Sequence, residues 1–209
     1  MECLDQFEKY LHAEERPYAS LIDAGLIHVQ FETMHPFLDG NGRIGRLLIV
    51  FFLILMGDLK QPLLYLSLYF KNNRQEYYNR LNAVRQTGDW EGWLEFFLTG
   101  VAQTADQVVE TSRAISALFA ADRTKTESLK RAGISARQVH GLLRSKAIVS
   151  AIDAAKALDI TVPTVRAALN NLKDLGIVRD ISGKGKERLY LYGGLVEILE
   201  KGTEPIAYQ

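Results

Sequence analysis

One stretch of the chain, from Thr33 to Leu48, limits the fold more than any other; it reads TMHPFLDGNGRIGRLL. A loop with two glycines stands directly before an unbroken apolar segment, which predicts a tight turn leading into a buried helix. Gly40, Asn41 and Gly42 can adopt backbone conformations that bulky residues resist, so their N–H groups can converge on one point. Convergent N–H groups bind phosphate oxygens, and the positive end of a following helix dipole would point into the same concavity.

The side chains around this loop supply the chemistry of a nucleotide site. Arg43 and Arg46 lie three residues apart, so on a helix they share a face where two guanidinium groups can grip a polyphosphate. Asp39 stands at the mouth of the loop, and a carboxylate beside bound phosphates is what Mg²⁺ uses when it bridges protein and nucleotide. His35 is the only group of the stretch that exchanges a proton near neutral pH, which predicts a general base.

Two generic nucleotide motifs were weighed against this interpretation. GNGRIG, residues 40–45, fits the G-x-G-x-x-G pattern, but that pattern needs a strand before it. The apolar residues of 24–35 do not alternate strictly and favour a helix instead. No G-x-x-x-x-G-K-[ST] occurs in the sequence. A dinucleotide fold and a P-loop enzyme are therefore both disfavoured.

The segment HPFLDGNGRIGR, residues 35–46, resembles the signature of the Fic family. In that signature His, Phe, Asp or Glu, Gly-Asn-Gly-Arg and a final Arg recur at these spacings, and this chain matches it without a gap. Residues 65–98 resemble the later helices of the same fold, so the resemblance covers roughly residues 2–120. It implies a mainly α fold with a Fic-type helical bundle.

The resemblance implies nucleotidyl transfer, usually of AMP from ATP to a Ser, Thr or Tyr hydroxyl of a target protein. His35 would take the proton of the attacking hydroxyl, Asp39 would hold Mg²⁺, and Phe37 would turn inward and anchor the loop. Such transfer asks mainly for positioning and charge stabilisation. The phosphate-binding residues that it implies are an anion hole of Gly40, Asn41 and Gly42, then Arg43 at the phosphates and Arg46 at the γ-phosphate.

Features that this chain keeps or lacks relative to the family pattern bear on the expected activity and its inhibition. The kinase-like branch of the family departs at the position of Gly42, and this chain keeps the glycine, which favours AMP transfer. Fic proteins usually carry a hairpin flap that docks the target, and often an inhibitory helix of the form [ST]-x-x-x-E-[GN]. Neither is identified before His35, so we expect a truncated or naturally short form. TGDWEG, residues 87–92, fits the inhibitory pattern but lies where the family has its own GDWE, and we interpret it as a chance match.

Composition narrows the setting. The single cysteine, Cys3, excludes an internal disulfide, and the N-terminus has no secretory pattern. The longest apolar run, Leu47–Met56, is ten residues and too short to span a bilayer, so we expect a cytoplasmic protein without a membrane partner. Net charge is zero, but residues 1–124 hold 11 Lys and Arg against 16 Asp and Glu, and residues 125–209 hold 14 against 9. This asymmetry predicts different partners for the two parts.

Residues 1–124 are expected to form the helical domain, and residues 125–134 a linker or the end of a long helix. The helix over 43–56 is apolar on nearly every face and is expected at the buried centre of the bundle. Trp90, Trp93, Phe96 and Phe97 recur at helical spacing, which is typical of core. Other helices are expected over residues 2–15, 18–34, 63–71, 73–86 and from 90 to about 130.

Residues 135–209 are expected to form a small winged helix-turn-helix domain, α with a short β-hairpin wing. Helices are expected over 136–145 and 150–159, and a third opens at the N-cap Thr161 and stops at Gly176. Residues 177–182 and 187–192 alternate as strands around a GKGK tip. The third helix would face a major groove and the tip would meet phosphates, with candidate contacts Thr164, Arg166, Asn170, Lys173, Lys184 and Lys186.

Two hypotheses follow. The first is a protein adenylyltransferase whose C-terminal domain selects a target. The second is a nucleotide-sensing, DNA-binding transcriptional regulator, although winged helices also mediate protein contacts. His35 favours the first, because a pure sensor has no need of a base. The expected partners are a target protein, DNA at the C-terminal domain and a second copy of the chain.

Overall fold

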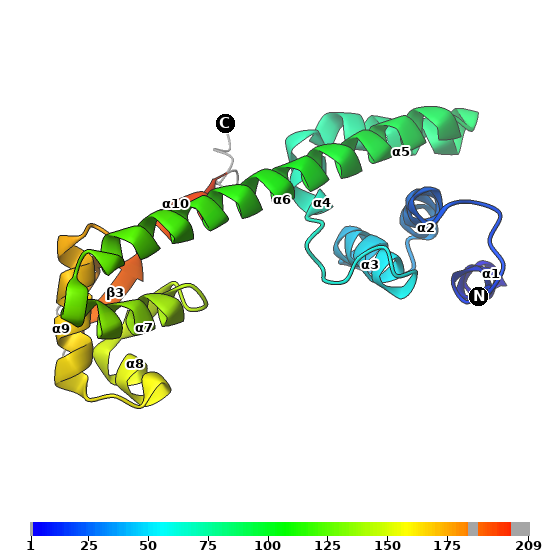
Figure 1. The fold of residues 1–209 in the computed structure, drawn as a ribbon. Helices are drawn as coiled ribbons and strands as arrows, with labels where there is room; N and C mark the ends of the chain where they lie inside the picture. The colour runs from blue at the N-terminus through cyan, green and yellow to red at the C-terminus, as the bar shows by residue number, and fades with distance from the viewer. Residues whose placement is uncertain (1, 184–187, 202–209) are drawn as a thin grey trace. The chain divides into compact units, whose positions relative to one another are not determined.

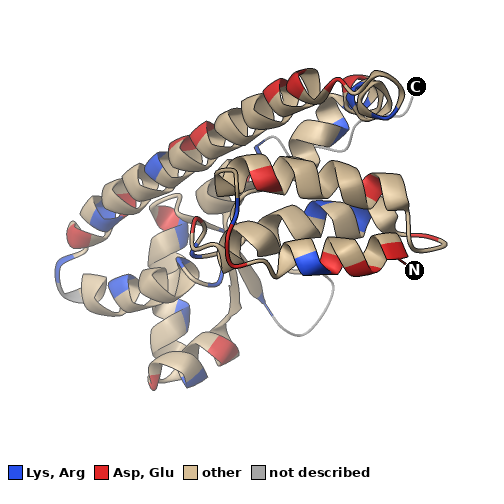
Figure 2. Cartoon of the chain, turned by 90° about the vertical axis from the view of Figure 1, so that its right-hand side faces the viewer, with Lys and Arg blue, Asp and Glu red and all other residues tan. Residues whose placement is uncertain are grey.

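The structure is a computed structural model that describes residues 2–183 and 188–201 (Figure 1). It is mainly helical with one small antiparallel sheet, as predicted. The chain divides into two compact units, Met1–Val109 and Glu110–Gln209, and each has its own apolar core. The sequence of the first unit holds 9 Lys and Arg against 14 Asp and Glu, and that of the second 16 against 11, so the charge asymmetry follows the two units. Figure 2 colours the charged residues along the described parts of the ribbon.

The first unit is a helical bundle. Its longest helix continues beyond residue 109 into the second unit without a break. The helix before the glycine-rich loop and the helix after it pack along each other. The bounds are α1 (Glu2–Leu11), α2 (Ser20–Met34), α3 (Asn41–Leu55), α4 (Leu66–Asn72), α5 (Arg74–Thr87) and α6 (Trp90–Glu127).

The predicted aromatic stripe on α6 forms much of this core. Trp93, Phe96 and Phe97 are buried, whereas Trp90 at the start of the helix is 40% exposed. The Trp93 indole N–H donates to the carbonyl of Gly25 at 3.0 Å, which ties α6 to α2. A Cβ at Gly25 would lie 3.0 Å from a ring carbon of Phe97, so glycine permits this close packing.

The expectation that α3 is buried on nearly every face is wrong. Ile49, Phe52 and Leu53 are buried, but Leu47, Phe51 and Leu55 are 53%, 60% and 66% exposed. These three follow one another at helical spacing along one side of α3, a side that no described element covers. Apolar composition therefore overestimated the burial of this helix.

The second unit combines the end of α6 with short helices and a sheet. The strands pair antiparallel in the order β1-β3-β2, with Val149 opposite Tyr190 and Arg179 opposite Leu191. The first strand was not predicted, and the two predicted strands are shorter than expected. The bounds are η1 (Lys130–Ala132), α7 (Gly133–Leu143), β1 (Ile148–Ser150), α8 (Ala151–Leu158), α9 (Val162–Asp174), β2 (Val178–Asp180), β3 (Leu189–Tyr192) and α10 (Gly193–Glu200).

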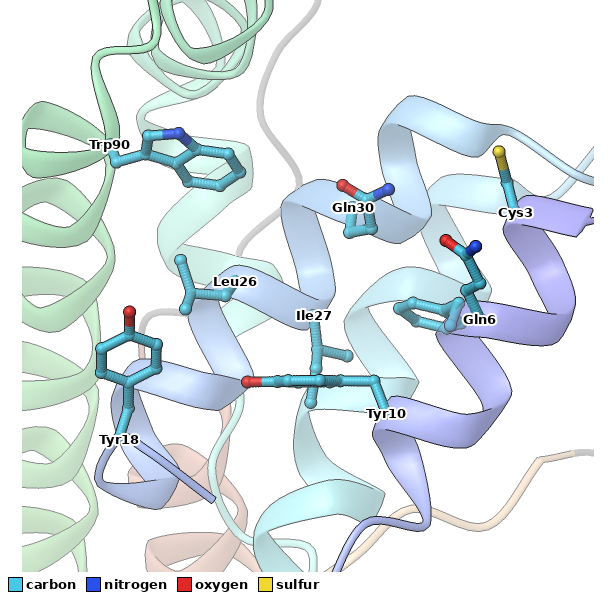
Figure 3. Close-up of a pocket in the computed structure, with 9 residues that line it drawn as sticks. Cys3, Gln6, Tyr10, Tyr18, Leu26, Ile27, Gln30 and Trp90 are labelled. Carbon is cyan, nitrogen blue, oxygen red and sulfur yellow. The ribbon is translucent and has the colours of Figure 1, made fainter. Parts of the chain in front are cut away.

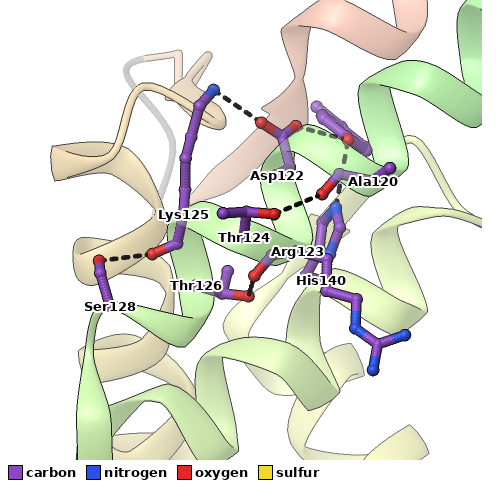
Figure 4. A network of polar contacts seen from close by, with 9 residues as sticks. Ala120, Asp122, Arg123, Thr124, Lys125, Thr126, Ser128 and His140 are labelled. Atoms are coloured by element: carbon purple, nitrogen blue, oxygen red, sulfur yellow. Dashed lines mark hydrogen bonds and ion pairs between the residues drawn. The ribbon is translucent and has the colours of Figure 1, made fainter.

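A buried polar network joins α6, α7 and β3 in this unit (Figure 4). Asp122 is 1% exposed and receives a 2.7 Å contact from the Lys125 ammonium on one oxygen. The ring Nε2 of His140 lies 3.1 Å from the hydroxyl of Tyr192, and Phe119 packs edge-on against His140. The polar groups of this core are thus satisfied by one another.

Candidate functional site

The site is built on the turn between α2 and α3. His35 follows α2 directly and adopts the left-handed conformation, with φ 47° and ψ 55°. Its N–H donates to the carbonyl of Phe31 at 3.0 Å, which closes the helix, and its side chain is exposed. A residue other than glycine is uncommon in this region, and such strain persists only where the surroundings hold it. The predicted base therefore stands at an unusual, fixed backbone position.

A side chain, rather than the backbone alone, closes the loop. Asn41 is 2% exposed, and its Oδ1 accepts from the N–H of Phe37 at 2.9 Å. Its Nδ2 donates to the carbonyl of the same residue at 2.5 Å. The expectation that Phe37 turns inward as the anchor is wrong, because its ring is 50% exposed and lies 6.3 Å from that of Phe31. Asn41 is the anchor of this loop.

Gly40 turns the chain into α3. Its φ of 82° is a left-handed conformation that glycine adopts without steric cost, and its carbonyl accepts from the N–H groups of Arg43 and Ile44. The helix therefore begins at Asn41, two residues earlier than predicted. By helix geometry the N–H groups of Asn41 and Gly42 have no partner within the helix. They are available to an anion at this helix end.

The two arginines lie three residues apart in α3, as predicted, but their guanidinium groups have different neighbours. The Arg43 guanidinium reaches back to Asp39, 3.3 Å away, and both side chains are largely exposed. Such an exposed ion pair contributes little to the stability of the fold, and its side chains can rearrange readily when a ligand binds. Arg46 is half-buried, and its Nη1 lies 3.1 Å from where a Cβ of Gly42 would stand. Both cations thus lie near the first turn of α3.

Asp39 fits a shared metal site. One carboxylate oxygen accepts from the N–H of Gly40 at 2.6 Å, and the side chain is 93% exposed. Mg²⁺ is usually held by one or two carboxylates together with substrate phosphates, so a single exposed carboxylate beside an anion site suits it. Within the described residues no group of three His, Cys, Asp or Glu side chains could hold a metal without such help.

A buried polar group behind the loop was missed by the sequence interpretation. Glu32 is 7% exposed, and its Oε1 has no hydrogen-bond partner in the described part of the chain. Burial raises the pKa of its carboxyl, while Arg46, His35 and Arg85 oppose that shift. A Cβ at Gly45 would lie 2.6 Å from this oxygen, so the last glycine of GNGRIG serves the packing of α3 on α2. No local pattern distinguishes Glu32 from a surface glutamate.

His28 belongs to the core of the first unit. It is fully buried, its Nε2 lies 2.8 Å from the Tyr77 hydroxyl, and its ring stacks on those of Phe70 and Trp93. Burial lowers its pKa to about 4, with Arg46 acting in the same direction. The ring is therefore neutral at physiological pH.

A separate hollow of about 360 Å³ lies between α1 and α2 (Figure 3). The rings of Tyr10, Tyr18 and Trp90 stand around Leu26 and Ile27. The Tyr10 hydroxyl donates to Asp23 at 2.6 Å. The lining includes none of the residues of the loop, and we treat this hollow as distinct from the candidate site.

Four of the six candidate DNA contacts lie on α9. Thr161 caps this helix as predicted, since its Oγ1 accepts from the N–H of Thr164. Lys184 and Lys186 lie outside the described residues. The four described candidates are exposed: Thr164, Arg166, Asn170 and Lys173. No helix in the described ranges is long and apolar enough to cross a membrane.

Comparison with known proteins shows which family and which fold this chain is similar to. Residues 1–53, which hold α1, α2, the loop and most of α3, match the Fic/DOC family. The fold is similar to the crystal structure of a Fic family protein from Desulfovibrio desulfuricans G20, with a TM-score of 0.50 and 22% identity. That match covers 92% of this chain and 55% of the other, so the chain spans little more than half of that protein. The segment with the candidate site is thus similar in sequence to the Fic/DOC family, and the chain is similar in fold to one Fic family protein.

Proposed function

We propose that this chain transfers AMP from ATP to a hydroxyl side chain of a target protein. The observation that carries the proposal is the arrangement at one turn. His35 is held in a left-handed conformation at the end of α2, beside the first turn of α3 with its free N–H groups and two flanking arginines. The match of residues 1–53 to the Fic/DOC family supports it, because members of that family commonly AMPylate proteins.

The chemistry assigned to these residues is a displacement at the α-phosphorus. The hydroxyl oxygen forms a bond to phosphorus while the bond to the bridging oxygen breaks, so pyrophosphate leaves and the hydroxyl proton passes to His35. The N–H groups of Asn41 and Gly42 and the two guanidinium groups would stabilise the charge that develops on the phosphate oxygens. Asp39 would hold Mg²⁺, which when bound neutralises phosphate charge.

Gly42 supports transfer of a nucleotidyl group over that of a phosphoryl group. A Cβ there would lie 3.1 Å from the Arg46 guanidinium, which is closer than most Cβ contacts, so a side chain at this position would require the guanidinium to shift by a few tenths of an ångström. The kinase-like branch of the family resembled by the motif departs at this glycine. This chain keeps the glycine, with Arg46 beside it.

The test compares the chain with its His35→Ala variant in the presence of Mg²⁺. Each is incubated, alone and with lysate, with ATP labelled at the α-phosphate and then with ATP labelled at the γ-phosphate. The expected result is protein-bound label from the α position only, lost in His35→Ala while ATP binding survives, because the base acts only in the chemical step. His12→Ala is the matched control, since His12 is an exposed histidine outside the site. Label from the γ position, or α-label that persists without His35, would contradict the proposal.

A DNA-binding regulator is the second candidate. Its specific support is that α9 directs Thr164, Arg166, Asn170 and Lys173 outward after a short turn from α8, as a recognition helix would. The test is fluorescence anisotropy of duplex DNA at two salt concentrations. Binding that weakens as salt rises and loses affinity in Arg166→Ala would favour this candidate.

A further inference from the structure

The end of α2, where His35 stands, is held by a residue from a distant helix. The last four carbonyl groups of a helix have no partner within it. In α2 the carbonyl of Phe31 accepts from the N–H of His35. The carbonyl of Glu32 instead accepts from Nη2 of Arg85 at 2.7 Å. Arg85 lies in the last turn of α5, more than fifty residues along the chain.

Arg85 makes a second contact on the same helix. Its Nε donates to the hydroxyl of Thr33 at 3.3 Å. A guanidinium that donates to two successive residues is fixed in position and orientation, because its planar donors cannot move independently. Its positive charge also faces the negative end of the α2 dipole. Both charge and geometry therefore stabilise the last turn of α2.

We propose that Arg85 is a positioning residue for His35. The left-handed conformation of His35 costs free energy and has to be imposed by its neighbours. Arg85 fixes the carbonyl of Glu32 and the hydroxyl of Thr33, and both residues lie in the last turn of α2, shortly before His35. This inference rests on the function proposed for His35, and it adds that α5 sets the angle from which the base meets the attacking hydroxyl.

Arg80, an arginine on the same helix, makes different contacts. Arg80 pairs with Glu76 on its own helix and with Asp89 just beyond it. Arg80 lies five positions before Arg85 on the same helix. Arg80→Ala is therefore a matched control: the same side chain is removed from the same helix without touching α2.

The first measurement is amide hydrogen exchange, which needs no assumption about activity. In Arg85→Ala the protection of the His35 N–H, bonded to Phe31, is expected to fall about 10-fold or more, the scale of a hydrogen bond to a charged group. Arg80→Ala should leave that amide protected. Equal protection in both variants would overturn the positioning role, whatever the protein catalyses.

The second measurement is the rate at which label from α-labelled ATP enters protein at saturating ATP. Arg85→Ala should lower this rate about 100-fold, the scale of a misplacement by about 1 Å, while the Kd for ATP stays within about 2-fold. Arg85→Lys should restore part of the rate, since one ammonium can replace the bond to Glu32. Thr33→Val should lower the labelling rate less than Arg85→Ala does, because it removes only the longer of the two contacts of Arg85.

The outcomes separate this inference from the proposed function. A normal labelling rate in Arg85→Ala, or a rate loss fully explained by weaker ATP binding, overturns the positioning role. Absence of any His35-dependent label in the unmodified chain overturns the proposed function. In that case exchange at the His35 N–H still decides whether Arg85 holds the end of α2.

Discussion

The hydroxyl of Tyr192 donates a 2.7 Å hydrogen bond to Asp122, seventy residues earlier in the chain, and both side chains are almost fully buried. The bond joins β3 to the end of α6. Burial is the main cause that raises the pKa of Tyr192, with the hydrogen bond to Asp122 next. A carboxylate at this depth depends on its partners, because a buried charge without them is costly.

Tyr192→Phe is expected to destabilise the second unit by about 2 to 3 kcal/mol, because it removes one partner of a buried carboxylate. Urea unfolding of the chain measures this. The control is a double-mutant cycle with Asp122→Asn. The two changes should be non-additive by about 1 kcal/mol or more, and simple additivity would mean that the bond contributes nothing.

Stability should fall between pH 6.5 and pH 4 in part through His28. Burial lowers its pKa to about 4, so in this range the unfolded chain binds a proton that the folded chain does not. Stability from this residue is therefore present above pH 6.5 and lost as pH falls, by about 3 kcal/mol in all.

Unfolding free energies at pH 7 and pH 5 check this prediction. His28→Gln should flatten the pH dependence, whereas His12→Gln, at an exposed position, should leave it as it is. Burial also lowers the pKa of His140, so some dependence remains in His28→Gln. An unchanged slope in His28→Gln would show that His28 does not titrate as expected.

Asn41→Ala should abolish binding of ATP without unfolding the chain. The change leaves the N–H and the carbonyl of Phe37 without their side-chain partner, at a cost of about 1 to 3 kcal/mol, and frees the loop before α3. Calorimetric titration with ATP, together with thermal unfolding, separates the two effects. Asn41→Asp keeps the acceptor for the Phe37 N–H and should retain part of the binding. ATP affinity equal to that of the unmodified chain in Asn41→Ala would contradict the role of Asn41 as the anchor of the loop.

Arg46→Ala is expected to weaken ATP binding far more than AMP binding, about 10-fold or more, because its expected ligand is the γ-phosphate. Arg43→Ala, which removes the arginine paired with Asp39, is the comparison. Titrations of each variant with ATP and with AMP give the ratio directly. An equal loss of affinity for ATP and AMP would show that Arg46 does not bind the γ-phosphate.

Much of the first unit could be predicted from local sequence, because its signals are local. The periodicity gave each helix near its observed place, and the burial of Trp93, Phe96 and Phe97 followed from their spacing. The start of α3 was placed two residues late, since the left-handed Gly40 allows the helix to begin at Asn41. The predicted N-cap at Thr161 was confirmed, because capping depends only on residues within the same helical turn.

Features that depend on distant residues could not be predicted. β1 has only three residues, and it is defined by pairing with β3 some forty positions later. The contacts of Arg85 on α2 span more than fifty residues. The resemblance of residues 35–46 to the Fic signature implied that Phe37 anchors the loop. In the structure the buried side-chain amide of Asn41 is the anchor. The DNA-binding role of α9 stays a prediction.

Gly45 shows that a position can resist replacement for a reason unrelated to chemistry. Its missing Cβ leaves room for the Glu32 carboxyl between α2 and α3. In a saturation library of this chain scored by activity, Gly45 should rank beside His35 among the least tolerant positions. Scored by cellular abundance, His35 should drop from that ranking and Gly45 should remain, because one residue serves the reaction and the other the folded state.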